Sequence, residues 1–432
     1  MTKQEKLMER RRKVVPNAIG VFNPSTAVSA QGSTITDLNG RELIDFAAGI
    51  GVMNVGHCPE PVVRAIQNQA ARLMHTCFNV AMYDGYIELA EKLVELLPHG
   101  EETKVMLTNS GAEAVENAIK IARQATGKAG ILCFTGAFHG RSMMAMSLTA
   151  KVGNKLGCGP FAGELYRLDF PNYYRFGKGM TENEYIDQEI QKLNDFFVTH
   201  ADAGNMAAAI IEVVQGEGGF NVVPRRYLQA LRAVCDAKGM LLILDEVQTG
   251  FGRTGEWAAY NHYGVAPDIS TWAKAMGGGM PIGCVMGKAH IMDGAKPGTL
   301  GGTYLGNPVC CAASLATLRY MEEIDINKLG RKVGKIIEQR FYAMKDKYSA
   351  IGHVRGLGAM MAMEFVKDGN PWLPNTEMVA NIVKGCAEEG LIIISAGTYG
   401  NVIRALCPLV IEEEMLHKGL DILESQIAKF AA

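Results

Sequence analysis

Short apolar runs alternate with amphipathic stretches through the middle of the chain. Four runs have strand length and are bounded by turn residues or charges, at 129–135, 206–214, 239–244 and 282–287. Such runs are typical of strands buried on both faces of a mostly parallel sheet. The stretches between them have apolar residues at helical spacing, as at 111–126, 183–199 and 226–238. The alternation predicts an α/β fold, with helices wound around that sheet.

The pattern changes near residue 327, where a long amphipathic stretch runs to about 348. Strand candidates then follow at 359–365, 391–395 and 402–406, interleaved with helical patterns at about 377–390 and 411–430. This order predicts a smaller α+β domain. Segment 33–46 has a hairpin signal at Asn39-Gly40 and is expected to join that domain. We therefore expect an N-terminal segment 1–59 that joins the small domain, a large domain 60–325 and a C-terminal small domain 326–432.

Chain length, net charge and cysteine spacing limit the number of domains and the kinds of partner to be expected. A chain of 432 residues exceeds the ~250–300 residues that one core usually serves, which favours two packed domains. The net charge of −2 lacks the basic excess that would favour nucleic acid or an anionic membrane. The basic N-terminus has no apolar stretch of a secretion signal, so the cytoplasm is the expected location, with an organelle origin left open. Ten cysteines are scattered without a CxxC pair, which predicts reduced thiols and no metal site.

A candidate anion site lies at residues 108–127, where Ser110, Gly111 and Ala112 lead into a strong helical pattern. The first turn of a helix offers free backbone N–H groups and the positive end of the helix dipole, and a phosphate group fits there. The alternative is a capped helix with nothing bound, in which Asn109 or Ser110 is the N-cap.

Two further residues carry chemistry of their own. Asp245 ends an apolar strand, where open α/β sheets bind ligands, and a carboxylate there is costly without a cationic partner such as a protonated pyridine nitrogen; the alternative is a structural ion pair or a helix cap. Lys274 lies in an apolar run followed by three glycines, and desolvation favours the neutral amine that a nucleophilic lysine needs; the alternative is a lysine that only reaches the surface. Gly250–Gly255 matches the GxGxxG pattern, but Asp245 and Glu246 would lie where a pyrophosphate must bind, so a dinucleotide site is disfavoured.

These motifs, in this order, resemble the class III (ω-amino acid) aminotransferases of pyridoxal-phosphate (PLP) fold type I. The resemblance runs over essentially the whole chain and is strongest with the bacterial 4-aminobutyrate and 5-aminovalerate aminotransferases. It rests on IDFAAGIGVMNVGH (44–57), HTCFNV, FTGAFHGR, EVVQGEGG, LDEVQTGFGRTG, TWAKAMGGGMP, GGTYLGNP and TYGNVIRALCPL (398–409). It implies a large domain with a mostly parallel sheet and a smaller α+β domain.

The resemblance also implies a role for each cofactor-binding residue. Lys274 would be the Schiff-base lysine and proton shuttle, and Asp245 would pair with the pyridine nitrogen. Phosphate would be held by Ser110, Gly111 and Ala112, with Thr303 contributed by the neighbouring subunit of a homodimer or dimer of dimers. His139 would line the cofactor site, Phe138 would stack on the ring, and Gln248 would bind its 3-hydroxyl. Ala112 and Phe138 depart from the residues usual in the family, as does Val213.

For the substrate, the resemblance implies carboxylate recognition by two arginines, Arg141 and Arg404, with Glu217 paired to the second arginine when a monoacid binds. Ile50 and Asn79 would also line the substrate site; Asn79 replaces a glutamine and Gly51 an alanine. The implied reaction moves the amine of 4-aminobutyrate, or next 5-aminovalerate, to 2-oxoglutarate. An amino-acid racemase or epimerase, an aminotransferase for ornithine or a diamine, and a binding protein without catalysis are the alternatives.

Overall fold

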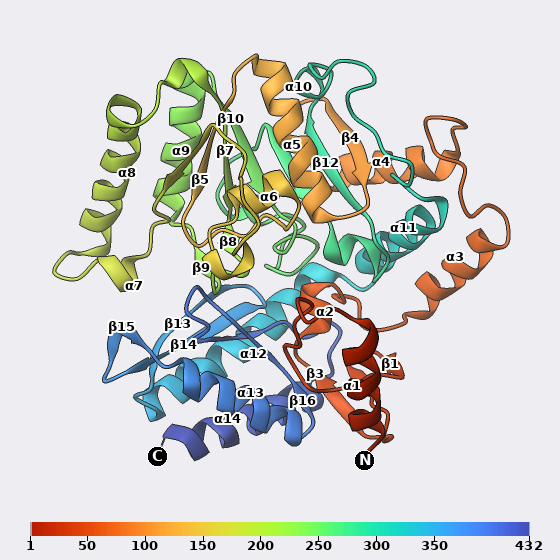
Figure 1. The fold of residues 1–432 in the computed structure, drawn as a ribbon, viewed down its shortest axis with the longest axis vertical. Helices are drawn as coiled ribbons and strands as arrows, with labels where there is room; N and C mark the ends of the chain where they lie inside the picture. The colour runs from red at the N-terminus through yellow and green to blue at the C-terminus, as the bar shows by residue number, and fades with distance from the viewer. Residues whose placement is uncertain (1, 432) are drawn as a thin grey trace.

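A seven-stranded sheet forms the centre of the upper half of the molecule in Figure 1. The structure is a computed structural model that describes residues 2–431. In spatial order the strands are β4 (Thr103–Thr108), β12 (Gly283–Lys288), β11 (Ile269–Trp272), β10 (Leu241–Asp245), β7 (Met206–Glu212), β5 (Gly130–Phe134) and β6 (Leu165–Leu168). The predicted mostly parallel sheet is confirmed, with β12 antiparallel to both of its neighbours.

Helices cover both faces of this sheet, because successive side chains of each buried strand point to opposite faces. On β5, Ile131 and Cys133 pack with α5, whereas Leu132 and Phe134 belong to the core on the other face. The first face carries α5 (Gly111–Thr126), α6 (Met143–Leu148) and α10 (Ala289–Met292). The second carries α4 (Asp84–Leu96), α8 (Glu182–Thr199), α9 (Arg225–Lys238) and α11 (Pro308–Glu323), and α3 (Glu60–Ala70) packs on α11.

A second sheet lies below the first, in the blue part of Figure 1. Its order is β13 (Ile351–Leu357), β14 (Met360–Lys367), β18 (Val402–Ala405) and β17 (Ile394–Ala396), with β15 (Asn370–Pro374) paired to β14. The helices around it are α12 (Ile326–Lys347), α13 (Thr376–Glu388) and α14 (Glu413–Ala431). The helices and strands predicted after residue 327 are thereby confirmed, with one exception at 391–395.

That exception is a strand that changes sheet. The expected single strand at 391–395 is wrong, because Leu391–Ile392 forms β16 and Ile394–Ala396 forms β17, in two different sheets. Strand β16 pairs in parallel with β3 (Glu42–Asp45), which continues through β2 (Thr34–Thr36) to β1 (Ser29–Gln31). Ile393 between them is fully buried, so an unbroken apolar run serves both sheets.

The hairpin signal at Asn39-Gly40 is confirmed, because β2 and β3 pair antiparallel and Gly40 adopts φ +82° in the connecting turn. The N-terminal strands lie beside the lower half of the molecule together with α1 (Lys3–Val14) and α2 (Ala48–Gly51) (Figure 1). The domain boundaries after residues 59 and 325 stay a prediction. Within residues 2–431, no helix combines the length and apolarity of a membrane span.

Candidate active site

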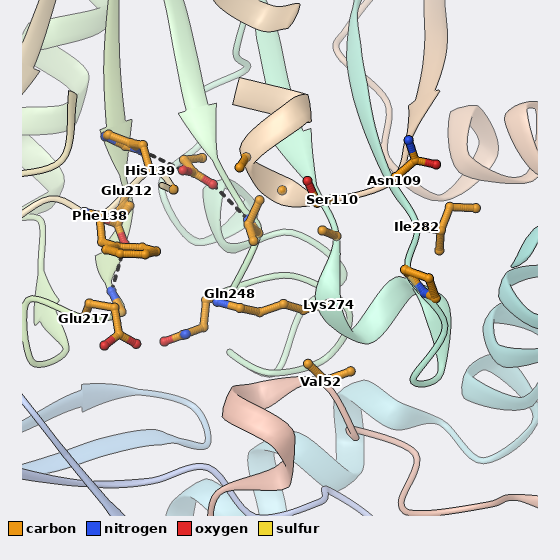
Figure 2. Close-up of a pocket in the computed structure, with 18 of the residues that line it drawn as sticks. Val52, Asn109, Ser110, Phe138, His139, Glu212, Glu217, Gln248, Lys274 and Ile282 are labelled. Atoms are coloured by element: carbon orange, nitrogen blue, oxygen red, sulfur yellow. Dashed lines mark hydrogen bonds and ion pairs between the residues drawn. The ribbon is translucent and has the colours of Figure 1, made fainter. Parts of the chain in front are cut away.

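A cavity of about 400 Å³ lies at the carboxyl edge of the large sheet, where the parallel strands end (Figure 2). Several strands of the large sheet contribute to it through the residues at or just after their ends, as Asp245 does for β10. This is the edge at which open α/β sheets bind ligands. The cavity is lined by these sequence-predicted residues: Ser110, Gly111, Ala112, Phe138, His139, Glu217, Asp245, Gln248 and Lys274.

Asp245 is buried, with 4% of its surface exposed, and three groups hold its carboxylate. Thr271 Oγ1 and the Val247 backbone N–H donate to Oδ1, both at 3.1 Å, and His139 Nδ1 lies 2.7 Å from Oδ2. A carboxylate oxygen accepts two hydrogen bonds, so Oδ2 keeps one free lone pair. The side chain is therefore fixed in place and can still accept a hydrogen bond from a cationic N–H in the cavity.

Lys274 lies two residues after the end of β11, beyond Ala273, and begins a short 3₁₀ turn, Lys274–Gly277. Its backbone has φ +49°, in the left-handed region that a lysine rarely adopts, so the surrounding structure must hold this strained geometry. Its side chain runs across the cavity toward the side where Phe138, Gln248 and Glu217 lie (Figure 2). Burial lowers the pKa of the amine, against the opposing charge of Glu217, and so favours the neutral nucleophile.

The anion turn lies at the N-terminus of α5. Ser110 is the N-cap, and its hydroxyl accepts from Glu113 N at 3.2 Å. A β-carbon built on Gly111 would lie 2.9 Å from Val247 Cγ1. The absence of a side chain at Gly111 therefore lets this turn lie close to the segment that follows Asp245. Of the two N-cap candidates, Asn109 and Ser110, the structure has Ser110, and this cap leaves the first N–H groups of α5 at the cavity, as an anion requires.

Glu217 and Arg404 form an ion pair at the mouth of the cavity. Arg404 Nη2 lies 2.6 Å from Glu217 Oε1, and Arg404 Nη1 donates to Gly216 O at 2.9 Å. The arginine is 1% exposed, whereas 31% of the glutamate side chain is exposed. Burial would raise the pKa of Glu217, but the charges of Arg404 and Lys274 outweigh it and hold that pKa below its usual value. The glutamate therefore faces the cavity as a carboxylate that neutralises a buried arginine.

Five of the predicted residues are not in the lining of this cavity: Arg404, which contacts it through Glu217, and Ile50, Asn79, Arg141 and Thr303. Ile50 is part of a left-handed stretch, with φ +69°, that leads to Val52 in the lining. Arg141 is exposed and follows Gly140, which does line the cavity. Asn79 and Thr303 are both exposed, and the segments that carry them lie together, since Asn79 Nδ2 is 3.3 Å from a β-carbon built on Gly301.

Glu212 is a lining residue that the sequence reasoning missed. It ends β7, beside Asp245 in the register of the sheet, and is 6% exposed. Its carboxylate accepts from Phe138 N and Gly216 N, each at 2.9 Å. Burial raises its pKa to about 7, and the charge of Asp245 adds to the effect while His139 opposes it. The signal that could have found it is the one used for Asp245, a carboxylate at the end of an apolar strand.

The residues present fit PLP. Gln248 Oε1 is buried without a hydrogen-bond partner among residues 2–431, and an acceptor in that state suits a ring hydroxyl. The lining supplies the other groups that the cofactor needs: a helix N-terminus for its phosphate, a buried carboxylate for its ring nitrogen, and a buried amine in reach of the same space. Phe138 adds an aromatic face.

The GxGxxG segment has a different place in the structure. Gly252 N donates to Glu256 O at 3.0 Å, and Gly252 and Gly255 have positive φ values, so the chain turns back on itself. A β-carbon on Gly252 would lie 2.9 Å from Ile326 of α12. These glycines therefore allow close packing against α12, and Gly255 is not followed by the α-helix that a dinucleotide fingerprint requires.

The wound α/β fold, with a lysine, a strand-end aspartate and an anion turn at one edge, defines the class of PLP-dependent transferases. Residues 20–427 match the model of the aminotransferase class-III family, and the chain belongs to that family. Amino acids and keto acids are accordingly its substrates.

Two relatives and one solved structure agree with this assignment. The chain is 47% identical over 420 residues to a 5-aminovalerate aminotransferase of Pseudomonas aeruginosa, covering 97% of each chain. It is 45% identical over 418 residues to a probable 4-aminobutyrate aminotransferase of Bacillus subtilis, covering 96% of each. An amine transaminase from an uncultivated Pseudomonas species, solved in its PLP-bound form, is 29% identical with a TM-score of 0.89, over 96% of each chain.

Proposed function

We propose that this enzyme moves the terminal amino group of an ω-amino acid, 4-aminobutyrate first and 5-aminovalerate next, to 2-oxoglutarate, giving a semialdehyde and glutamate. The observation that carries the proposal is the Glu217–Arg404 ion pair at the cavity that holds Lys274. An arginine whose charge is neutralised by a partly exposed carboxylate suits an enzyme that must accept a monoacid and a diacid in turn. The relatives named for 4-aminobutyrate and 5-aminovalerate support the same donors.

PLP, when bound, supplies the electron sink that makes the C–H bond beside the substrate nitrogen acidic. Asp245 keeps the ring nitrogen protonated, and Gln248 orients the ring through its buried acceptor oxygen. Phe138 stacks on the ring, and Ser110, Gly111 and Ala112 bind the phosphate at the start of α5. His139 fixes the carboxylate of Asp245 through the 2.7 Å hydrogen bond described above.

Lys274 would hold the cofactor through its amine, and the same amine would move the proton of the substrate C–H bond. A general base works best when its pKa is near the operating pH, and burial brings the amine of Lys274 down in that direction. The buried position also excludes bulk water from the proton transfer.

The two halves of the reaction use the arginines differently. With an ω-amino acid, the single carboxylate binds Arg141 while Glu217 keeps Arg404 neutralised. With 2-oxoglutarate or glutamate, Glu217 moves out and Arg404 binds the second carboxylate in bidentate fashion. The partial exposure of Glu217 leaves room for that movement. Ile50 and Asn79 complete the walls of the substrate channel.

We assign the enzyme to a homodimer or a dimer of dimers in which Thr303 reaches the phosphate of the neighbouring active site. Supporting this, the exposed surface near Thr303 is apolar, with Met74, Val80, Met82 and Tyr304 each more than half exposed. Exposed apolar patches of this kind mark protein interfaces. Thr303 and Asn79 lie in this surface rather than in the cavity of their own chain, as residues donated to a partner would.

A single-turnover absorbance experiment tests the proposal. The PLP-loaded protein is mixed separately with 4-aminobutyrate, 5-aminovalerate, ornithine and a branched α-amino acid, and the cofactor band is followed. We expect either ω-amino acid to convert the cofactor to its amine form, and 2-oxoglutarate to reverse the change. Lys274→Ala is the control, which should bind PLP without this conversion.

The outcomes separate the alternatives. Conversion by ornithine alone would redirect the assignment to an ornithine or diamine aminotransferase. If only the α-amino acid perturbs the spectrum and no amine form accumulates, the enzyme is a racemase or epimerase, and the roles given to Glu217 and Arg404 are wrong.

A further inference from the structure

The four-residue turn Gly216–Gly219 carries Glu217 and is a thin wall between two cavities. Gly216 and Glu217 line the 400 Å³ active-site cavity. Behind the turn, Gln215 and Gly218 line a second cavity of about 610 Å³, together with Arg355 and Glu364. Three of its four residues are glycines, which have no side chain to pack, so the position of the turn depends on its hydrogen bonds and on close contacts of its backbone.

Two of those hydrogen bonds come from residues beside the turn, since Gly216 N donates to Glu212 Oε2 and Asn221 Nδ2 donates to Gly218 O. Three others come from the second sheet and from the residue that follows β17. Arg404 of β18 donates to Gly216 O at 2.9 Å, Gly397 N donates to Glu217 O at 3.0 Å, and Arg355 Nε of β13 donates to Gly219 O at 2.8 Å. Figure 1 shows β8 (Val214–Gln215) and β9 (Asn221–Val222), which flank the turn, directly above β13 and β14. The turn that carries Glu217 is therefore clamped by elements far along the chain.

Arg355 is itself fixed by a buried ion-pair cluster, here called the Glu364 cluster and made of Arg175, Arg355 and Glu364. Arg355 Nη1 donates to Glu364 Oε2 at 2.6 Å, and Arg175 of α7 (Tyr173–Phe176) pairs with Glu364 Oε1. The Glu364 side chain is 2% exposed and the Arg355 side chain 10%. Neutralising one buried carboxylate with two guanidinium groups costs desolvation, so the cluster is weak evidence for stability and better evidence for positioning.

Glycine at position 219 lets Arg355 approach the turn closely. Gly219 has φ +100°, and a β-carbon there would lie 3.1 Å from Arg355 Nη2 and 3.1 Å from Val402 Cγ2. Val402 pairs with Glu364 across β18 and β14, and Arg404 follows two residues later on the same strand. The two residues that hold the ends of the turn, Arg355 on β13 and Arg404 on β18, thus lie on the two strands that pair with β14 in one sheet.

We propose that Arg355 is a positioning residue, which fixes the Gly216–Gly219 turn and thereby sets how firmly Glu217 pairs with Arg404. This rests on the proposed function, in which a diacid must displace Glu217 from Arg404 and a monoacid need not. Loosening the turn weakens the Glu217–Arg404 pair, so the diacid meets less competition while the monoacid is bound as before. The Glu364 cluster is then a determinant of the balance between the two substrate classes.

The experiment compares the binding of two unreactive acids, glutarate as diacid and butyrate as monoacid, to the PLP-loaded enzyme by calorimetry. In Arg355→Gln, we expect the ratio of the two dissociation constants to shift toward glutarate by about tenfold, as is typical for coupled residues of one network. Arg355→Lys keeps the charge but loses the guanidinium fork, and a smaller shift in the same direction is expected. An unchanged ratio, or an equal loss of affinity for both acids, would overturn the proposal.

Arg232→Gln is the matched control. Arg232 Nη1 lies 2.7 Å from the buried Asp268 Oδ2, next to the amino end of β11 and thus at the opposite edge of the large sheet. Arg232→Gln should lower the melting temperature without changing the ratio of the glutarate and butyrate dissociation constants. A change in that ratio as large as that of Arg355→Gln would count against a positioning role for Arg355. If Arg355→Gln does not fold, the Arg355→Lys ratio alone decides. Because these titrations need no turnover, a failure of the ω-amino-acid assay leaves their result readable.

Discussion

Replacing Glu212 by glutamine should change how the stability of the enzyme depends on pH. Burial raises the pKa of this carboxyl from 4.5 to about 7, so between these values the folded chain binds a proton that the unfolded chain has released. The free energy of unfolding therefore falls as the pH rises through this window. At ~1.4 kcal/mol per pKa unit, the loss reaches about 3 kcal/mol above the folded-state pKa.

The glutamine variant removes this dependence and keeps the shape of the side chain. Its amide oxygen can accept from Phe138 N or Gly216 N, while its NH₂ group faces the other N–H. That mismatch costs about 1–3 kcal/mol at every pH. Glu246 is a second buried carboxyl whose pKa is raised to about 7, and it gives the wild type and the variant the same additional pH dependence. The difference between variant and wild type isolates Glu212.

The assay is urea unfolding of the PLP-free protein at fixed concentration, from about pH 5 to about pH 8, analysed with a common m-value. The free energy of unfolding of Glu212→Gln, taken relative to that of the wild type, should rise by about 3 kcal/mol between the low and the high end of this pH range. Glu338→Gln, at an exposed carboxylate of α12, should give a flat difference. A flat difference for Glu212→Gln as well would refute the burial argument, because the carboxyl would then titrate alike in the folded and unfolded chains.

Three further substitutions test the cavity. Lys274→Ala should abolish turnover while PLP remains bound noncovalently, seen as a cofactor that dialysis removes. Ser110→Ala removes the N-cap of α5 and should cost about 1 kcal/mol in thermal unfolding, with weaker PLP binding by fluorescence titration. Gly140→Ala puts a β-carbon 2.7 Å from Ala112 Cβ at φ +129° and should destabilise by about 1–3 kcal/mol. Gly179→Ala, also at positive φ but with open space around it, should cost less; equal losses would contradict the close-packing explanation.

The apolar runs predicted four of the seven strands of the large sheet, β5, β7, β10 and β12, because burial on both faces leaves a continuous signal in the sequence. Strands β4, β6 and β11 were not predicted. The apolar runs did not predict that β12 runs antiparallel to β11 and β4, since periodicity contains no strand direction. The single run at 391–395 was also read as one strand, because nothing in an apolar stretch shows where the chain leaves one sheet for another.

The residues of the site also fall into those that the sequence pattern could predict and those that it could not. Asp245, Lys274 and the turn at Ser110 could be found from the residues themselves, since each is a polar group where a strand or helix pattern begins or ends. Phe138, Gln248 and the Glu217–Arg404 pair came from the resemblance alone, because long-range proximity leaves no local signal. The roles proposed for Asn79 and Thr303 involve a second chain, and a single chain does not display such contacts.

The parallel pairing of β3 with β16 has a consequence for how the enzyme is made. Ile44 pairs with Leu391, so a strand near the start of the chain waits for one that the ribosome produces near the end. Chains are synthesised at about 5–20 residues per second, and for most of that time β3 is an unpaired edge. The stretch that leads into the active site at Val52 follows β3 directly. Each new molecule therefore completes its catalytic cavity only after Leu391 and Ile392 have been translated.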